Sequence, residues 1–354
     1  MKRFIIRTLI FSFLPIITII SVNLYADPAY LFKQGKIEKQ IAEHILNGYN
    51  VNGITNLNER LLQKYIIENT PDTIKEIVLG SSRGMLIDKN LASNRTSFFN
   101  HSVSGGSLED FLGIYNLYIE QEKYPTSIII ELSPWVLNDN CSTGNRWKTL
   151  LQNYRSMSHI LQLSTAYDIF HIPNTEFLEL VSPSYFQESY RNLTSNDHIK
   201  SEPIPSTSPD SINAAILTDG SRLYDQKYNQ TDSAALSTLQ SENIGRFVHW
   251  GGFDRFQVLS SEKQEVFSRF IQYLQQKDTK LLFLLTPFHP LVYNELKKLY
   301  PIEDTENFFY SFAAQHNIKI TGSYNPEKYN FSIYDFHDGM HPRKHVYQTL
   351  LWNE

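Results

Sequence analysis

The chain has 354 residues, of which 41% are hydrophobic and 13% aromatic. This apolar content supports a sizeable core and excludes disorder as the main state. Its 37 acidic residues exceed its 32 basic ones, which gives a net charge of −5. Without a dense lysine and arginine stripe, nucleic acid is not an expected partner. The single cysteine, Cys141, excludes an intrachain disulfide and a cysteine-based structural zinc site.

The amino terminus combines positive charge with a long apolar run. Three basic residues come first: Lys2, Arg3 and Arg7. The run that follows, to Tyr25, has about the 20 residues that a membrane-spanning helix needs, and basic residues stay on the cytoplasmic side. We therefore expect residues 1–26 to form a membrane anchor and the bulk of the chain to be extracytoplasmic, in the periplasm or at the cell surface. A signal peptide cleaved after Ala26 is the alternative, although Leu24 is large for the position it would occupy.

Residues 27–72 are predicted to form a helical neck. Two groups of apolar residues recur there at helical spacing. They are Ile37, Ile41 and Ile45, then Leu57, Leu61, Leu62 and Tyr65. We expect both helices to pack on the globular part of the chain.

Residues 73–354 alternate short apolar runs with amphipathic segments. The predicted strands are Glu76–Leu79, Ser97–Asn100, Ser127–Leu132, Lys280–Thr286 and Asn317–Thr321. Such alternation predicts an α/β fold, a three-layer α/β/α sandwich with a mainly parallel sheet covered on both faces.

Helices are predicted between these strands. Ser107 with Asp110 and Ser261 with Gln264 are helix-start patterns, and a third helix is expected over 306–316. The alternation lapses over about residues 138–259, which we interpret as an insertion that carries a cap or a substrate surface. Residues 201–210 are its most loop-like part.

Polar and glycine-rich segments follow all five predicted strands. They are Gly80–Gly84, Asn100–Ser107, Ser133–Trp135, Pro287–Pro290 and Asp335–Pro342. In an open parallel sheet, ligands bind at the carboxyl ends of the strands, so these five loops should share one rim.

That rim contains the parts of a serine nucleophile site. A serine hydroxyl needs a base to accept its proton, and the base needs an orienting carboxylate. We expect Ser82 to be the nucleophile, His341 the base and Asp338 its partner. The amides of Ser82 and Gly105 are the expected donors to the developing oxyanion.

At these residues the sequence resembles the SGNH/GDSL hydrolases. Gly80-Ser81-Ser82, the segment Asn100–Gly105 and Asp338-Gly339-Met340-His341-Pro342 are similar to the first, second and fifth blocks of that superfamily. The resemblance covers residues 73–354 without the insertion. It is greatest to membrane-anchored envelope members, similar to proteins of teichoic-acid D-alanylation and exopolysaccharide O-acetylation. It implies a flavodoxin-like, SGNH-type sheet and the roles just given to Ser82, Gly105, Asp338 and His341.

The sequence departs from the family at its third block. There the family has Gly-x-Asn-Asp, whose Asn donates to the oxyanion, but Glu131–Trp135 occupies the position. Arg83 and Asn138 are candidates for the missing donor. His289 follows the fourth strand and is a further candidate for substrate binding.

A metal site is the competing interpretation of the last loop. His337, His341 and His345 recur every fourth residue, but Gly339 and Pro342 interrupt the helix that would align them. We therefore expect neither a metal nor another cofactor.

The resemblance implies an extracytoplasmic serine esterase or O-acyltransferase that acts on an acylated cell-envelope glycan or related polymer. The partners would be an acylated polysaccharide or glycolipid and the membrane, with a membrane acyltransferase as a further candidate. A catalytically silent module that binds polysaccharide or that acyltransferase is the alternative from a different class. A phosphate or metal hydrolase is a third hypothesis, which metal-dependent activity would favour.

Overall fold

The computed structural model describes most of the chain. The described residues are 2–26, 35–54, 57–141, 145–163, 180–194, 203–209, 213–226 and 244–352. The first part of the expected neck, much of the expected insertion and both ends of the segment 201–210 lie outside the described residues.

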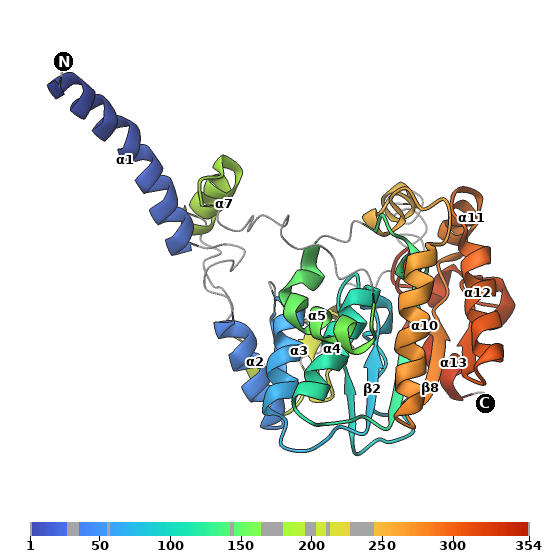
Figure 1. The fold of residues 1–354 in the computed structure, drawn as a ribbon. Helices are drawn as coiled ribbons and strands as arrows, with labels where there is room; N and C mark the ends of the chain where they lie inside the picture. Colours follow the sequence, from blue (N-terminus) through green and yellow to red (C-terminus); the bar gives the residue numbers. More distant parts are fainter. Residues whose placement is uncertain are drawn as a thin grey trace.

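Helices and strands are interspersed along the chain (Figure 1). The helices are α1 (Lys2–Ala26), α2 (Lys36–Leu46), α3 (Glu59–Asn69), α4 (Leu108–Glu120), α5 (Leu151–Ile160), α7 (Pro183–Thr194), α10 (Ser261–Gln276), α11 (Pro290–Leu299), α12 (Ile302–Gln315) and α13 (Lys344–Trp352). The strands are β1 (Asn50–Asn52), β2 (Glu76–Leu79), β3 (Phe98–Asn100), β4 (Ser127–Glu131), β5 (Ile204–Ser206), β6 (Ala215–Ile216), β7 (Arg222–Leu223), β8 (Lys280–Leu285) and β9 (Lys319–Gly322).

The larger sheet has five strands in the order β3-β2-β4-β8-β9, and every neighbouring pair is parallel. All five strands predicted from the sequence are present, with ends that differ by at most two residues. The predicted α/β class with a parallel sheet is therefore confirmed. Because parallel strands all end at one edge, the loops that follow them meet there.

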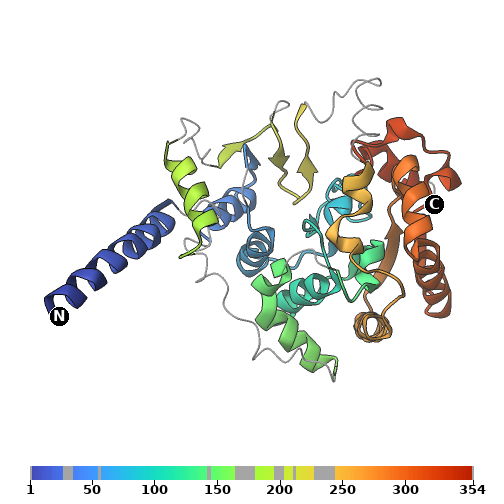
Figure 2. The same cartoon turned by 90° about the horizontal axis from the view of Figure 1, so that it is seen from above.

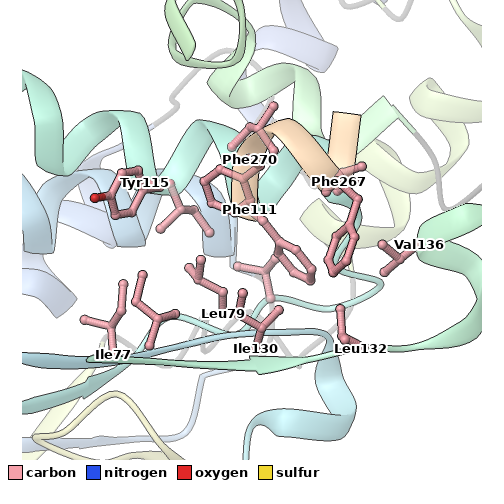
Figure 3. Packing of buried hydrophobic residues seen from close by; sticks show 14 of the residues in the cluster. Ile77, Leu79, Phe111, Tyr115, Ile130, Leu132, Val136, Phe267 and Phe270 are labelled. Atoms are coloured by element: carbon pink, nitrogen blue, oxygen red, sulfur yellow. The ribbon is translucent and has the colours of Figure 1, made fainter. Parts of the chain in front are cut away.

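Both faces of this sheet are buried, which explains why its strands are almost continuously apolar. On one face, Leu79 and Ile130 pack against Phe111 of α4 and Phe267 of α10 (Figure 3). Complete burial of each such side chain contributes roughly 1.5–3 kcal/mol. A separate apolar cluster covers the other face. It joins Val78, Ile129 and Leu284 to Val346, Tyr347 and Leu350 of α13.

A second, antiparallel sheet has the order β5-β1-β6-β7 (Figure 2). Its central strand β1 comes from the expected neck, whereas β5, β6 and β7 come from the expected insertion. The sequence predicted none of these strands, and β5 lies inside the segment taken as most loop-like. Strands of two or three residues are too short to show a period of two, which explains the omission.

Several helix boundaries differ from the predictions. Ser107 does begin α4 as expected, with a capping box to Asp110. For α10, however, the cap is Ser260, whose hydroxyl accepts the Lys263 N–H, so the helix begins one residue earlier than the predicted cap implied. Helix α12 begins at Ile302 rather than near 306, and α11 was not predicted.

At the amino terminus, α1 lies beside α7, and the Asn23 side chain donates a hydrogen bond to the Leu180 carbonyl. Within the described ranges, we find no helix that combines the length and the apolar character needed to cross a bilayer. The membrane anchor stays a prediction.

Candidate active site

The nucleophile turn begins where β2 ends. The chain passes through Gly80 and Ser81 into a short 3-10 helix, Ser82–Gly84. Glu131, at the end of β4, accepts hydrogen bonds from the Ser81 N–H at 2.9 Å and the Ser81 hydroxyl at 2.8 Å. The buried Glu131 carboxylate therefore holds the residue before Ser82 in a fixed conformation.

The loop that carries Asp338 and His341 is closed by backbone contacts at its base. Phe336 and Pro342 form an isolated β-bridge, and the His337 N–H donates to the His341 carbonyl at 2.8 Å. Inside the loop, one oxygen of Asp338 accepts the N–H groups of Met340 and His341 at 2.7 and 2.8 Å. These bonds fix the Asp338 carboxylate beneath the His341 ring.

The structure brings together the three residues proposed as nucleophile, base and orienting acid. His341 Nε2 lies 2.9 Å from Ser82 Oγ. On the other side of the ring, His341 Nδ1 lies 2.8 and 3.0 Å from the two oxygens of Asp338. A carboxylate can only accept, so Nδ1 carries the proton and Nε2 is the acceptor that faces the serine hydroxyl. The His341 and Asp338 side chains are 21% and 22% exposed, so substrate can reach the pair.

The turn with Gly105 lies directly against the nucleophile turn. The Val103 N–H donates to the Gly80 carbonyl at 3.0 Å, and a Cβ at Gly106 would lie only 2.4 Å from that same oxygen. Gly105 has a φ of +61°, in the left-handed region that favours glycine. Within the described residues, the amides of Ser82 and Gly105 donate no hydrogen bond.

Ser82 and His341 open into a cavity of about 450 Å³. One part of its wall is apolar and comes from Ile54, Met85, Ala214, Ala215 and Leu223. The polar part includes Glu59 from α3 and Arg222 from β7, whose charged groups lie 3.2 Å apart. The small sheet and the start of α3 therefore supply walls to a site whose reactive residues come from the large sheet.

Tyr224 follows β7 and also lines the cavity. Its ring meets the His341 ring edge-on, with the two ring centres 6.4 Å apart. Burial raises the pKa of the Tyr224 hydroxyl, and the charge of Asp338 raises it further. The tyrosine is therefore a neutral neighbour that limits the space beside the histidine.

Arg83, a candidate for the missing donor and for substrate binding, is not among the residues that line the cavity. Its buried guanidinium stacks on the Phe288 ring at 3.7 Å and donates to the carbonyls of Met340 and Thr286. Burial lowers the pKa of Arg83, and the negative charge of Glu131 opposes that effect. Arg83 thus ties the nucleophile turn to the loop that carries His341.

Asn138 and His289 also lie outside the lining of this cavity. The Asn138 amide donates to the carbonyls of Gly252 and Asp254 at 2.9 and 3.1 Å. His289 caps α11, where its Nδ1 accepts the Leu291 N–H at 3.2 Å. Burial lowers the pKa of His289 to about 4, although the charge of Asp338 opposes the shift. Both side chains therefore hydrogen-bond to the loop backbone.

The third block has a different function here from that in the resembling family. Ser133 donates to Glu131 at 2.8 Å, and its hydroxyl lies 3.1 Å from that of Ser81. These hydrogen bonds stabilise the nucleophile turn. The amides of Ser82 and Gly105 are therefore the remaining candidates for oxyanion donors.

A metal site was the competing interpretation of the loop that carries His337, His341 and His345. Among the residues that the structure describes, no three His, Cys, Asp or Glu side chains gather closely enough to hold a metal ion. His345 instead pairs with Asp335 at 2.7 Å.

Sequence reasoning missed Glu59 and Tyr224 as residues of the cavity. Glu59 begins a neck helix, and Tyr224 follows a two-residue strand. Only the pairing of distant segments brings them to Ser82, so no local pattern marked them.

No protein-family model matches this sequence, and no curated protein is significantly similar to it. The likeness to the SGNH/GDSL hydrolases therefore depends on the quoted segments and on the geometry of this site.

Proposed function

We propose that this protein is an SGNH-like serine esterase or O-acyltransferase with a flavodoxin-like α/β/α core. The observation that carries the proposal is the chain of hydrogen bonds from Ser82 through His341 to Asp338 at the mouth of a cavity. The distances, near 2.8–2.9 Å, suit proton transfer from a serine hydroxyl to a neutral imidazole.

In the first step, Ser82 Oγ attacks the carbonyl carbon of an ester while its proton moves to His341 Nε2. The carboxylate of Asp338 stabilises the imidazolium, and the amides of Ser82 and Gly105 stabilise the oxyanion. Collapse of the tetrahedral intermediate breaks the ester bond, and His341 donates the proton to the departing alcohol. The product of this step is an acyl group on Ser82.

In the second step, water or an acceptor hydroxyl attacks the acyl carbon, and His341 accepts its proton. Collapse releases an acid if water attacked, or a new ester if a hydroxyl attacked, and returns the proton to Ser82. Hydrolysis and transfer therefore use the same residues and differ only in the second nucleophile.

The cavity supports a substrate with a short acyl group on a polar carrier. Its apolar wall suits the acyl group, and Arg222 and Asp225 offer polar partners to sugar hydroxyls. An acylated cell-envelope polysaccharide or glycolipid fits both demands. We place the bulk of the chain outside the cytoplasm because three basic residues precede the apolar run at its amino terminus.

The mechanism is tested with a short-chain aryl ester in a stopped-flow experiment. We expect a burst of released phenol equal to the enzyme concentration and an acyl group retained on the wild-type protein. Ser82→Ala should show neither, whereas Ser268→Ala on α10 should behave as wild type. Equal covalent labelling of wild type and Ser82→Ala would exclude the serine mechanism.

A catalytically silent module that binds polysaccharide or a membrane acyltransferase is the second candidate. The replacement of the third-block Asn favours it, because loss of one oxyanion donor costs roughly 10²- to 10³-fold in rate. If wild type, Ser82→Ala and His341→Ala hydrolyse the ester equally slowly, this function replaces the first.

A further inference from the structure

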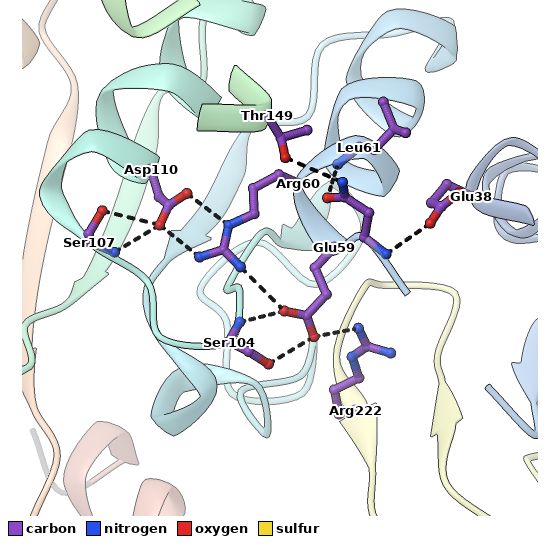
Figure 4. A network of polar contacts seen from close by, with 10 residues as sticks. Glu38, Glu59, Arg60, Leu61, Ser104, Ser107, Asp110, Thr149 and Arg222 are labelled. Atoms are coloured by element: carbon purple, nitrogen blue, oxygen red, sulfur yellow. Dashed lines mark hydrogen bonds and ion pairs between the residues drawn. The ribbon is translucent and has the colours of Figure 1, made fainter. Parts of the chain in front are cut away.

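A polar network joins the start of α3 to the turn that carries Gly105 (Figure 4). The Glu59 carboxylate accepts the Ser104 N–H at 2.5 Å and the Ser104 hydroxyl at 3.1 Å. The same carboxylate pairs with Arg222 at 3.2 Å. One half-buried carboxylate therefore contacts both the residue before Gly105 and the small sheet.

The next residue of α3 fixes the other end of this turn. The Arg60 guanidinium makes two parallel hydrogen bonds to Asp110, at 2.9 and 2.8 Å. Asp110 in turn accepts the N–H and the hydroxyl of Ser107 at 3.0 and 3.2 Å. Two adjacent neck residues thus hold Ser104 and Ser107, with Gly105 between them.

This arrangement restrains Ser104, whose carbonyl forms the peptide bond with the Gly105 amide. A glycine at a φ of +61° has no side chain that would restrain it, so its orientation depends on its neighbours. Hydrogen bonds to a charged acceptor are roughly twice as strong as neutral ones, and Ser104 donates two to Glu59. An oxyanion donor stabilises the transition state only if it is aligned before the reaction begins.

We propose that Glu59 is a positioning residue that aligns the Gly105 amide toward the oxyanion, and that Arg222 holds Glu59 in place from the small sheet. The inference rests on the serine mechanism proposed above. Glu59 lines the cavity, but it is not a second base. One of its oxygens accepts the Ser104 hydroxyl and faces Arg222, while the other accepts the Ser104 N–H and lies 3.8 Å from Arg60.

The test compares Glu59→Ala with Glu59→Gln in steady-state hydrolysis of the aryl ester. Glu59→Ala removes both bonds to Ser104, and we expect kcat to fall about 10- to 100-fold with KM changed less than about twofold, somewhat less than the loss of a whole oxyanion donor. Glu59→Gln keeps an oxygen for the Ser104 N–H and should recover most of the lost kcat. Arg222→Met leaves the bonds to Ser104 intact and should lower kcat by only about 2- to 5-fold.

Glu68→Gln is the matched control, because Glu68 lies on the same helix in an exposed ion pair with Lys64. If wild type is active and Ser82→Ala is inactive, a wild-type kcat in Glu59→Ala overturns this inference and leaves the proposed serine mechanism standing. If wild type and Ser82→Ala are equally inactive, the proposed mechanism fails and the inference fails with it. Should Glu59→Ala not fold, wild-type kcat in both Glu59→Gln and Arg222→Met is the overturning result.

Discussion

The two sheets of this protein contribute to one cavity in different ways. The parallel sheet has strands of three to six residues, is buried on both faces and carries Ser82, Asp338 and His341 on its loops. The antiparallel sheet has strands of two or three residues drawn from the neck and the insertion, and it supplies a wall. The loops of the large sheet therefore position the three proposed catalytic residues, and the small sheet forms part of the cavity in which substrate would bind.

The largest effect should come from the loops of the large sheet. Ser82→Ala and His341→Ala should each lower kcat for ester hydrolysis by roughly 10⁴-fold or more, as expected for residues that act as a unit. The double variant should lose little beyond either single one. Rates are compared by following phenol release. Additive losses in the double variant would show that the two residues act separately.

Matched substitutions in the two sheets should separate stability from substrate binding. Ile130 in β4 and Ile216 in β6 are both almost fully buried. Ile130→Ala should lower the free energy of unfolding by about 2–5 kcal/mol and leave KM near that of wild type. Ile216→Ala should lower it less and should raise KM, because a two-residue strand opens locally. Urea denaturation and steady-state kinetics measure both effects, and the reverse pattern would contradict our division of roles.

The nucleophile turn and the turn that carries Gly105 approach each other closely, which gives a sharper test within the large sheet. Gly106→Ala places a methyl group against the Gly80 carbonyl and should lower the free energy of unfolding by about 1–3 kcal/mol. Gly245→Ala, in the insertion, meets no atom within 4 Å and should change it by less than about 0.5 kcal/mol. Equal unfolding midpoints in urea for the two variants would mean that the turns are less tightly packed than described.

The smallest expected effect is a pH dependence of stability. Burial lowers the pKa of His101 to about 3, whereas a histidine in an unfolded chain titrates near 6.5. The unfolded chain binds a proton between these pH values that the folded chain does not, so stability falls as pH drops below about 6.5. His101→Gln should weaken this dependence, measured by urea midpoints at pH 7.5 and 5. The exposed His159→Gln should retain the wild-type slope, and an unchanged slope in His101→Gln would contradict the assignment.

The parallel sheet could be predicted because each of its strands is recognised from a short run of neighbouring residues. A strand buried on both faces must be almost wholly apolar, as Ile128, Ile129 and Ile130 illustrate. Loops after such strands converge by geometry alone, which is why Ser82, Asp338 and His341 could be named in advance.

The rest of the site depends on contacts between distant segments. Asn138 and Arg83 were reasonable donors by position, but their partners are carbonyls of other loops, which no spacing rule identifies. Glu59 had no signal at all, since a glutamate at the start of a helix is ordinary. Side-chain partners of this kind become visible only when the fold is known.

The pairing of β1 with β5 has a consequence for the order of folding. Asn50 pairs with Ser206, and Ser127 of β4 pairs with Lys280 of β8, so both sheets contain contacts between residues roughly 150 positions apart, whereas β2 and β3 are joined by about 20. Closing so long a loop is slow, so neither sheet should be complete until strands from the second half of the chain pair with those of the first half. A nascent chain would then form β2, β3 and β4 early, but Ser82 would meet His341 only after the end of the chain has been made, so the hydrogen-bonded site should be completed late.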